Sequence, residues 1–244
     1  MMRLDIFLAE NGFFKSRSLA SSMIKSGKVS VNGRIQKKPS SEVDGSEKIG
    51  ISETLKYVSR AGLKLEQALL CFGTDVKGKT VLDIGASTGG FTDCLLKNGA
   101  FHVFALDVGS MQLDETLRND KRVTVMENFN ARNAKKSDFP CEIDMITMDV
   151  SFISQTLIYK AASDILKENG IMITLIKPQF EAGRENIGKG GIVKDRDGKI
   201  FGAILEKLKN SASENGFSLI KTADSPIRGG DGNREYLALL KKTK

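Results

Sequence analysis

Beyond about residue 60, short apolar runs alternate with longer stretches whose apolar residues recur at helical spacing. The runs predict strands at residues 79–84, 101–108, 122–126, 143–150, 170–177, 217–222 and 234–240. Helices are predicted between them, at 60–72, 89–98, 153–168 and 195–214. This alternation predicts an α/β fold with a doubly wound sheet, whose ligand binds at the carboxyl ends of the strands. A glycine-rich turn at 225–233 precedes the last strand, which could therefore run antiparallel beside the sixth.

The first fifty residues follow a different pattern. Apolar residues at helical spacing predict a helix that begins near Leu4 and is stopped by Gly12. A second helix follows, which Ser16 or Ser18 can cap and which ends at Gly27. Two helices this short form a very small core, so the segment depends on further elements for stability.

A hairpin is predicted directly after these helices. The runs VSV and RIQ flank Asn32-Gly33, the dipeptide best suited to a tight turn in which both residues have positive φ. The sequence therefore divides into a small α+β domain at 1–48, a linker at 49–60 and a large α/β domain at 61–244.

The formal net charge of +7 is distributed unevenly over the 244 residues. Residues 1–60 hold 11 basic and 6 acidic side chains, whereas the rest of the chain holds 26 and 24. A small basic module ahead of a nearly neutral body suggests a nucleic-acid anchor on an enzyme. A lysine-rich solvated surface would give the same composition.

Few residues are available for histidine or thiolate chemistry. His102 is the single histidine, so a triad hydrolase or a histidine-ligated metal would have to be built around it. Cys71, Cys94 and Cys141 contain no C-x-x-C spacing and are too few for a four-thiolate zinc site, and we expect no metal. Sparse cysteines without a leader fit the cytoplasm, and no run approaches the roughly 18 apolar residues of a spanning helix, so no membrane is expected.

The segment VLDIGASTGGF (81–91) predicts a nucleotide site, because a strand leads into a glycine loop and then a helix. Its spacing does not fit the dinucleotide pattern G-x-G-x-x-G, which disfavours an NAD enzyme. It is similar to the D-x-G-x-x-x-G pattern of S-adenosylmethionine-dependent methyltransferases. A plain strand–turn–helix is the alternative, and Asp83 could be only a capping or turn residue. The candidate cofactor residues are Asp83, Gly85, Ala86, Ser87, Gly89, Gly90, Phe91, Asp107, Val108, Asn130 and Asp149.

Two charged residues end neighbouring strands, Asp149 in ITMDVSF and Lys177 in TLIKPQF. Both are expected at the same rim as the glycine loop. Lysine is seldom buried unpaired, so a carboxylate partner and a chemical role are indicated. A lysine that simply reaches solvent at a strand end is the simpler alternative.

The large domain resembles the FtsJ/RrmJ-type ribose 2′-O-methyltransferases, whose active site is a Lys-Asp-Lys-Glu tetrad. The motifs YVSRAGLKL, MDVSFIS, LIKPQFE and GNREYL place that tetrad at Lys64, Asp149, Lys177 and Glu235. The resemblance implies a Rossmann-like fold with a seven-stranded, mostly parallel sheet and an antiparallel last strand.

The N-terminal domain resembles the S4 RNA-binding domain in Arg3-Leu4-Asp5, Ser16-Arg17-Ser18 and the hairpin segment. The combination is typical of the TlyA family, also called hemolysin A. It implies methyl transfer from S-adenosylmethionine to a ribose 2′-hydroxyl of 16S or 23S ribosomal RNA, or of both, with cytidine as the target and ribosomal subunits as partners. Lys177 is then the candidate base, or it only positions the hydroxyl.

Nine cations are candidates for RNA contact: Arg3, Lys15, Arg17, Lys25, Lys28, Arg34, Arg60, Arg184 and Lys189. The last two lie in the glycine-rich segment 181–195, which is either a mobile loop over the RNA entrance or a solvated connector. Two other functions remain open: a catalytically silent ribosome-assembly factor, and, more weakly, a membrane-active hemolysin.

Overall fold

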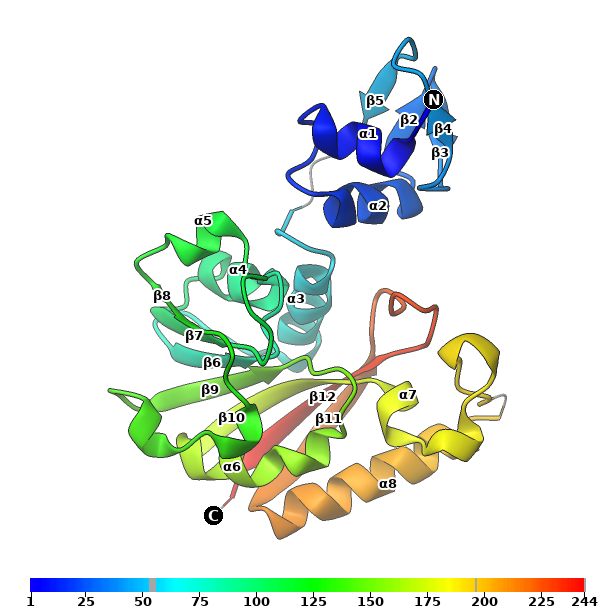
Figure 1. Cartoon of the computed structure of the whole chain (residues 1–244). Helices are drawn as coiled ribbons and strands as arrows, with labels where there is room; N and C mark the ends of the chain where they lie inside the picture. Colours follow the sequence, from blue (N-terminus) through cyan, green and yellow to red (C-terminus); the bar gives the residue numbers. More distant parts are fainter. Residues whose placement is uncertain (53–55, 196, 244) are drawn as a thin grey trace. The chain divides into compact units, whose positions relative to one another are not determined.

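The computed structural model describes residues 1–52, 56–195 and 197–243. The chain divides into two compact units, Met1–Arg60 and Ala61–Lys244 (Figure 1). Each unit has its own hydrophobic core.

The small unit packs two helices against short strands. Its elements are β1 (Met2–Arg3), α1 (Leu4–Glu10), α2 (Arg17–Lys25), β2 (Val29–Val31), β3 (Arg34–Gln36), β4 (Glu42–Val43) and β5 (Ile49–Ile51). Its core contains Leu4 and Leu8 from α1 and Met23 and Ile24 from α2, all with at most 1% of their surface exposed. The helical spacing in the sequence therefore predicted the buried face of both helices.

The turns of the small unit form as the sequence predicted. Ser16 caps α2, because its hydroxyl accepts a hydrogen bond from the Leu19 amide at 3.2 Å. Gly27 follows the helix in the left-handed region, with φ of 74°. Asn32 and Gly33 have φ values of 51° and 77°, and they connect β2 to β3 as the predicted hairpin.

Residues 49–51 belong to the small unit, so the predicted start of the linker at 49 is wrong. Ile49–Ile51 forms β5, which pairs antiparallel with β2 and completes a three-stranded sheet in the order β3-β2-β5. The pairing joins segments about twenty residues apart, which sequence periodicity over three residues cannot reveal. Residues 53–55 of the predicted linker lie outside the described residues.

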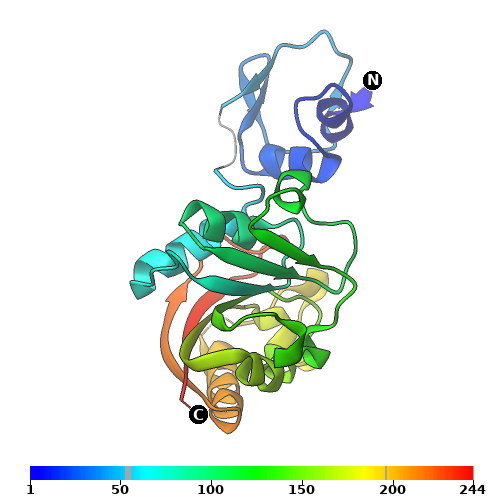
Figure 2. The ribbon, with the colours of Figure 1, turned by 90° about the vertical axis from the view of Figure 1, so that its left-hand side faces the viewer.

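The large unit is built on one sheet with the strand order β11-β12-β10-β9-β6-β7-β8 (Figure 2). The strands are β6 (Thr80–Ile84), β7 (His102–Leu106), β8 (Val123–Met126), β9 (Ile143–Met148), β10 (Leu166–Ile176), β11 (Phe217–Asp224) and β12 (Tyr236–Lys242). The strand β12 runs antiparallel to both of its neighbours, and the ladders from β10 to β8 are parallel. The predicted fold class is confirmed, and the last strand lies beside the sixth and also beside the fifth.

Helices cover both faces of this sheet, with α3 and α4 on one face and α6 and α8 on the other (Figure 1). The helices are α3 (Ala61–Phe72), α4 (Gly90–Lys97), α5 (Glu115–Arg118), α6 (Tyr159–Ile165), α7 (Pro178–Glu181) and α8 (Lys199–Glu214). Short 3₁₀ turns are η1 (Ala131–Asn133), η2 (Lys136–Asp138), η3 (Gln155–Leu157), η4 (Arg184–Asn186) and η5 (Lys189–Gly191). Of the described helices, none is long and apolar enough to cross a membrane.

Two predicted helix boundaries are wrong for identifiable reasons. The helix predicted at 195–214 begins at Lys199, because the Asp195 carboxylate accepts hydrogen bonds from the Ile200 and Phe201 amides and so precedes the helix as a cap. The helix predicted at 153–168 ends at Ile165, where β10 begins with an irregular first segment.

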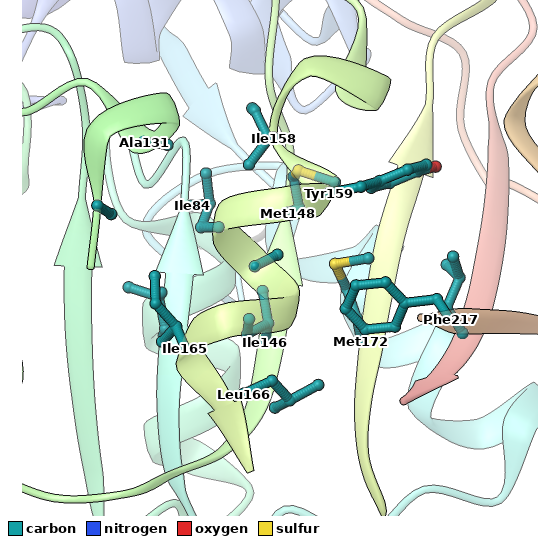
Figure 3. Packing of buried hydrophobic residues seen from close by; sticks show 14 of the residues in the cluster. Ile84, Ala131, Ile146, Met148, Ile158, Tyr159, Ile165, Leu166, Met172 and Phe217 are labelled. Atoms are coloured by element: carbon teal, nitrogen blue, oxygen red, sulfur yellow. The ribbon is translucent and has the colours of Figure 1, made fainter. Parts of the chain in front are cut away.

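The main core lies between the sheet and the two helices α6 and α8. Figure 3 shows the side chain of Met148 from β9 beside Tyr159 from α6, with Ile146, Met172 and Phe217 in the same cluster. Each of these five residues has at most 1% of its surface exposed. Close packing of this kind fixes the strand ends, and the strand ends carry the residues considered next.

Candidate active site

The glycine loop after β6 requires glycine for steric reasons. Gly85 has φ of 82°, and a side chain there would collide with the backbone oxygen of Asp149. Gly89 has φ of 93°, and a Cβ there would collide with the side chain of Leu117 in α5 and lie 2.8 Å from that of Leu113. The loop therefore approaches the segment after β9 on one side and α5 on the other as closely as a backbone can.

A cavity of about 460 Å³ opens beside this loop, at the carboxyl ends of β6, β7 and β9. Of the predicted cofactor residues, Gly85, Ser87, Asp107, Val108, Asn130 and Asp149 line it. Leu106, Phe129 and Ile158 add apolar surface. A mostly apolar hollow with a few polar groups suits a nucleoside-sized ligand, so the residues present fit S-adenosylmethionine.

Two backbone amides hold the carboxylate of Asp107 in the lining of the cavity. It accepts hydrogen bonds from the Ser87 amide at 2.8 Å and from the Gly109 amide at 2.7 Å. The Ser87 hydroxyl in turn donates to the Gln112 side chain at 3.2 Å. An acidic group fixed at the end of the strand that follows the glycine loop can accept hydrogen bonds from ribose hydroxyls.

Asp83 does not line the cavity. It is fully buried, and its two carboxylate oxygens accept hydrogen bonds from Thr92 at 2.7 Å and from Thr147 at 2.8 Å. Burial raises the pKa of this carboxyl to about 7, against the lowering effect of the two hydroxyls. The structure therefore corresponds to the alternative interpretation, in which Asp83 stabilises the turn: it joins β6, the first turn of α4 and β9. Ala86, Gly89, Gly90 and Phe91 also lie outside the set of lining residues.

The predicted tetrad is present as two ion pairs. In the first, Lys177 Nζ lies 2.6 Å from Asp149 Oδ1 and donates a hydrogen bond to Ser151 at 2.8 Å. Lys177 directly precedes α7, where Pro178 occupies the first helical position. Only 12% of the lysine side chain and 15% of the aspartate side chain are exposed. Since Asp149 also lines the cavity, the lysine is coupled to the cofactor site through one carboxylate.

In the second pair, Lys64 of α3 donates to Glu235, which directly precedes β12. Only 10% and 3% of their side chains are exposed. The ladder between β10 and β12 ends with Ile176 opposite Tyr236, so Lys177 and Glu235 occupy the next opposed positions. The two pairs therefore lie at neighbouring strand ends on one edge of the sheet.

Glu127 organises the cavity wall, although the sequence analysis did not single it out. Its carboxylate accepts hydrogen bonds from the amides of residues 111–113 and from Arg118. The Arg118 bond is the main reason that the pKa of Glu127 is lowered to about 2. The segment 111–113 that Glu127 binds includes Gln112, which lines the cavity. No spacing pattern in the sequence predicts that a carboxylate binds backbone amides so far away in the chain.

Phe152 is a second residue that the sequence analysis did not assign. Its side chain lines the cavity, yet 91% of the residue is exposed, and its φ is 64°. Its ring lies 5.1 Å from the ring of Phe180, in α7 after Lys177. A large apolar residue with unfavourable backbone geometry at the rim of a site indicates a ligand-facing role.

The glycine-rich segment 181–195 is attached to the loop that carries Glu235. Asn233 accepts from the Val193 amide at 3.0 Å and donates to the Gly191 oxygen at 2.9 Å. Arg184 and Lys189 lie exposed on η4 and η5. Their RNA contacts stay a prediction, as does the choice between a mobile cover and a connector.

The small unit has a polar groove of about 610 Å³. Its lining includes four of the predicted RNA-binding cations, Arg3, Arg17, Lys25 and Arg60. Lys15, Lys28 and Arg34 lie elsewhere on the unit. No group of three or more histidine, cysteine or acidic side chains in the described part of the chain is arranged to hold a metal ion.

Known proteins share both units of this chain. Residues 57–242 match the FtsJ-like methyltransferase family, and residues 2–49 match the S4 domain. Hemolysin A of Brachyspira hyodysenteriae is 46% identical over 242 residues, which cover 97% of this chain and 98% of the relative. The 16S/23S rRNA (cytidine-2′-O)-methyltransferase TlyA of Mycobacterium tuberculosis is 36% identical over 241 residues, which cover 98% of this chain and 89% of the relative.

A solved structure of a Streptococcus thermophilus protein is 45% identical, with a TM-score of 0.80 over 99% of this chain and 88% of the other. The resemblance found in the sequence motifs is therefore confirmed. The chain belongs to the FtsJ-like methyltransferase family, within the group of proteins named TlyA or hemolysin A that carry an S4 domain before the methyltransferase domain.

Proposed function

We propose that this protein is a ribosomal RNA methyltransferase that modifies a ribose 2′-hydroxyl of a cytidine in ribosomal subunits. S-adenosylmethionine is the methyl donor of this enzyme. The position of Asp149, which lines the cofactor cavity and also pairs with Lys177 at 2.6 Å, carries the proposal. A cofactor site and a candidate proton acceptor thereby share one side chain.

Different residues around the cavity serve cofactor binding and methyl transfer. When bound, the cofactor supplies an electrophilic methyl group on a sulfonium centre. Asp107 holds the ribose end of the cofactor, and the apolar wall excludes water from the nucleoside. Asp149 follows β9, which lies on the other side of β6 from β7 and Asp107, and it offers a negative charge next to the lysine.

We assign Lys177 as the base that acts on the attacking ribose hydroxyl. A ribose hydroxyl is a weak nucleophile while it keeps its proton, so a base at the moment of attack accelerates transfer. Asp149 and Ser151 fix the direction of the lysine Nζ, which holds it at the rim. The buried Lys64–Glu235 pair at the next strand end stabilises the local backbone and keeps a second cation close to the site. Much of the rate then comes from positioning of the two reactants.

The substrate class is supported by features outside the cofactor cavity. The S4 domain and its basic groove can bind structured RNA through phosphates and ribose. The exposed ring of Phe152 at the cavity rim can stack on an unpaired base. Ribosomal RNA as the substrate and cytidine as the target follow the named activity of the Mycobacterium tuberculosis relative. The proposed site of action is therefore the cytoplasm, where ribosomal subunits are assembled.

Methyl transfer from tritiated S-adenosylmethionine to purified small and large ribosomal subunits tests this function. We expect label in ribosomal RNA with the wild-type protein and none with Lys177→Ala, while the variant still binds the cofactor in calorimetry. Mapping of 2′-O-methylation by primer extension then gives the nucleotide and the subunit. RNA binding without label in either subunit would identify a silent assembly factor instead and refute the enzyme.

A further inference from the structure

The groove of the small unit contains one carboxylate among its cations. Its lining residues are Arg3, Asp5, Arg17, Ser18, Ser21, Ser22, Lys25 and Arg60. An acidic residue in a surface that binds a polyanion is unfavourable by simple electrostatics. Asp5 nevertheless lies in the groove, with only 2% of its surface exposed.

Asp5 binds two of the arginines in a defined geometry. Arg3 donates from Nε and Nη2 to the two carboxylate oxygens, each at 3.0 Å. Arg17 donates from Nε to Oδ2, also at 3.0 Å. The Ile6 amide adds a backbone bond to Oδ1 at 3.1 Å, which fixes the carboxylate itself. The hydrogen bond from Arg3 is the main reason that the pKa of Asp5 is lowered to about 2.

These contacts occupy only part of each guanidinium group. Among the residues that the structure describes, no acceptor binds Arg3 Nη1 or the two Nη atoms of Arg17, so these donors can bind other acceptors. The side chains of Arg3 and Arg17 remain 44% and 58% exposed, whereas that of Asp5 is 3% exposed. The carboxylate therefore lies behind two outward-facing donors that come from different elements, the residue before α1 and the start of α2.

We propose that Asp5 is a positioning residue for RNA binding, which holds Arg3 and Arg17 as one two-armed clamp for backbone phosphates. The proposal rests on the RNA substrate of the proposed function. Long arginine side chains lose rotamer freedom when they bind, and Asp5 orders both of them before RNA arrives. The serines of α2 that share the groove, Ser18, Ser21 and Ser22, lie where hydroxyls can hydrogen-bond phosphate or ribose oxygens beside the clamp.

Net charge and the positioning role of Asp5 predict opposite changes in RNA affinity when Asp5 is neutralised. If Asp5 acts only through its charge, its neutralisation strengthens RNA binding. If it positions the arginines, the same change weakens binding, because both guanidinium groups must then be ordered by the RNA itself.

The test uses the full-length protein and a fluorescein-labelled RNA hairpin, with affinity measured by anisotropy. Asp5→Asn keeps the size of the side chain and the acceptor for the Ile6 amide. We expect its Kd for the hairpin to rise about fivefold or more. Glu10→Gln, which removes an exposed charge from the same unit, is the matched control and should leave the Kd unchanged or slightly lower.

A second measurement separates positioning from a general structural effect. In an Arg3→Gln/Arg17→Gln background, Asp5→Asn should change the Kd by less than about twofold, because the residues through which it acts are gone. A loss that persists in this background, or an Asp5→Asn variant that binds as tightly as the wild type, would overturn the inference.

Arg17→Lys keeps the inference testable if Asp5→Asn does not fold. Lysine retains the charge but lacks the planar fork that binds Asp5 and phosphate together, so we expect a loss close to that of Arg17→Gln. Full affinity in Arg17→Lys would overturn the clamp. A wild-type chain that binds no RNA would refute both this inference and the proposed function, whereas intact wild-type binding with an unaffected Asp5→Asn refutes only the inference.

Discussion

Asp5 in the small unit and Asp83 in the large unit have at most 2% of their surface exposed, yet their partners differ. Two guanidinium groups bind Asp5, and the hydrogen bond from Arg3 contributes most to a pKa of about 2. Asp83 accepts hydrogen bonds from the hydroxyl groups of Thr92 and Thr147, and burial raises its pKa to about 7. A carboxyl group with little exposed surface can thus shift in either direction: the guanidinium groups that cover Asp5 near the surface favour its ionised form, whereas deep burial favours the protonated form of Asp83.

The comparison extends to the candidate active site. Asp149 and Glu235 resemble Asp5, because each is paired with a cation. They differ from Asp5 in what the cation can reach: the arginines of the groove are about half exposed, whereas Lys64 and Lys177 are at most 12% exposed. Exposed arginines suit a long polyanion, and enclosed lysines suit one reacting group.

The largest expected effect concerns the lysine at the cavity. Lys177→Arg keeps a positive charge next to Asp149 but replaces the amine that we propose as the base with a guanidinium group, which stays protonated. We expect kcat for methyl transfer to fall by about 10²- to 10⁴-fold, with the affinities for S-adenosylmethionine and for the RNA hairpin within about twofold of wild type. Single-turnover transfer assays and anisotropy measure the two quantities. Turnover above a tenth of the wild-type rate would show that charge alone suffices, and the distinction between the two kinds of cation would fail.

The next effect is on stability and concerns the enclosed pair. Lys64→Ala leaves Glu235 buried without its partner, and we expect the free energy of unfolding to fall by about 3–5 kcal/mol in urea titrations. Arg17→Ala in the groove breaks a partly exposed pair, and its cost should stay below about 1 kcal/mol. The double variant Lys64→Met/Glu235→Leu should recover most of the loss, since no buried charge remains. Equal costs for Lys64→Ala and Arg17→Ala would remove burial as the distinguishing factor.

The sequence predicted the fold well because its signals are local. Strand runs, glycine turns and the Asn32-Gly33 hairpin each act within a few residues, and the structure confirms them. The tetrad positions came from family motifs, and the register of β10 against β12 places Lys177 and Glu235 at opposed positions although they are far apart in the chain. Asp83 lies outside the cavity lining, and sequence spacing does not show whether a side chain at a strand end points to a ligand or into the packed interior. Phe152 was missed because an apolar residue after a strand is usually buried, and only its backbone conformation turns it outward.

A smaller effect tests the ionised carboxylate of the cofactor cavity. Asp107→Asn keeps the size of the side chain but leaves one oxygen for two amide donors and removes the charge. We expect the Kd for S-adenosylmethionine, measured by calorimetry, to rise about tenfold. Asp138→Asn, on the exposed turn η2 of the same unit, is the control and should not change it. An unchanged Kd in Asp107→Asn would mean that the cavity binds its ligand through apolar surface alone.

The last expected effect is a pH dependence that arises from Asp83. Its folded pKa of about 7 lies above the ordinary aspartate value of 3.8, so between these values the folded state keeps a proton that the unfolded state has released. Its contribution to stability is therefore fully present below about pH 4 and is lost as the pH rises toward 7, with a slope of at most about 1.4 kcal/mol per pH unit. Asp83→Asn can keep both threonine contacts, because its amide accepts from one hydroxyl and donates to the other. Urea unfolding of both proteins from pH 4.5 to 7.5 should show the wild type losing stability relative to the variant as the pH rises. Parallel curves would mean that Asp83 is already ionised in the folded protein at low pH, and the contrast with Asp5 would then have no basis in charge.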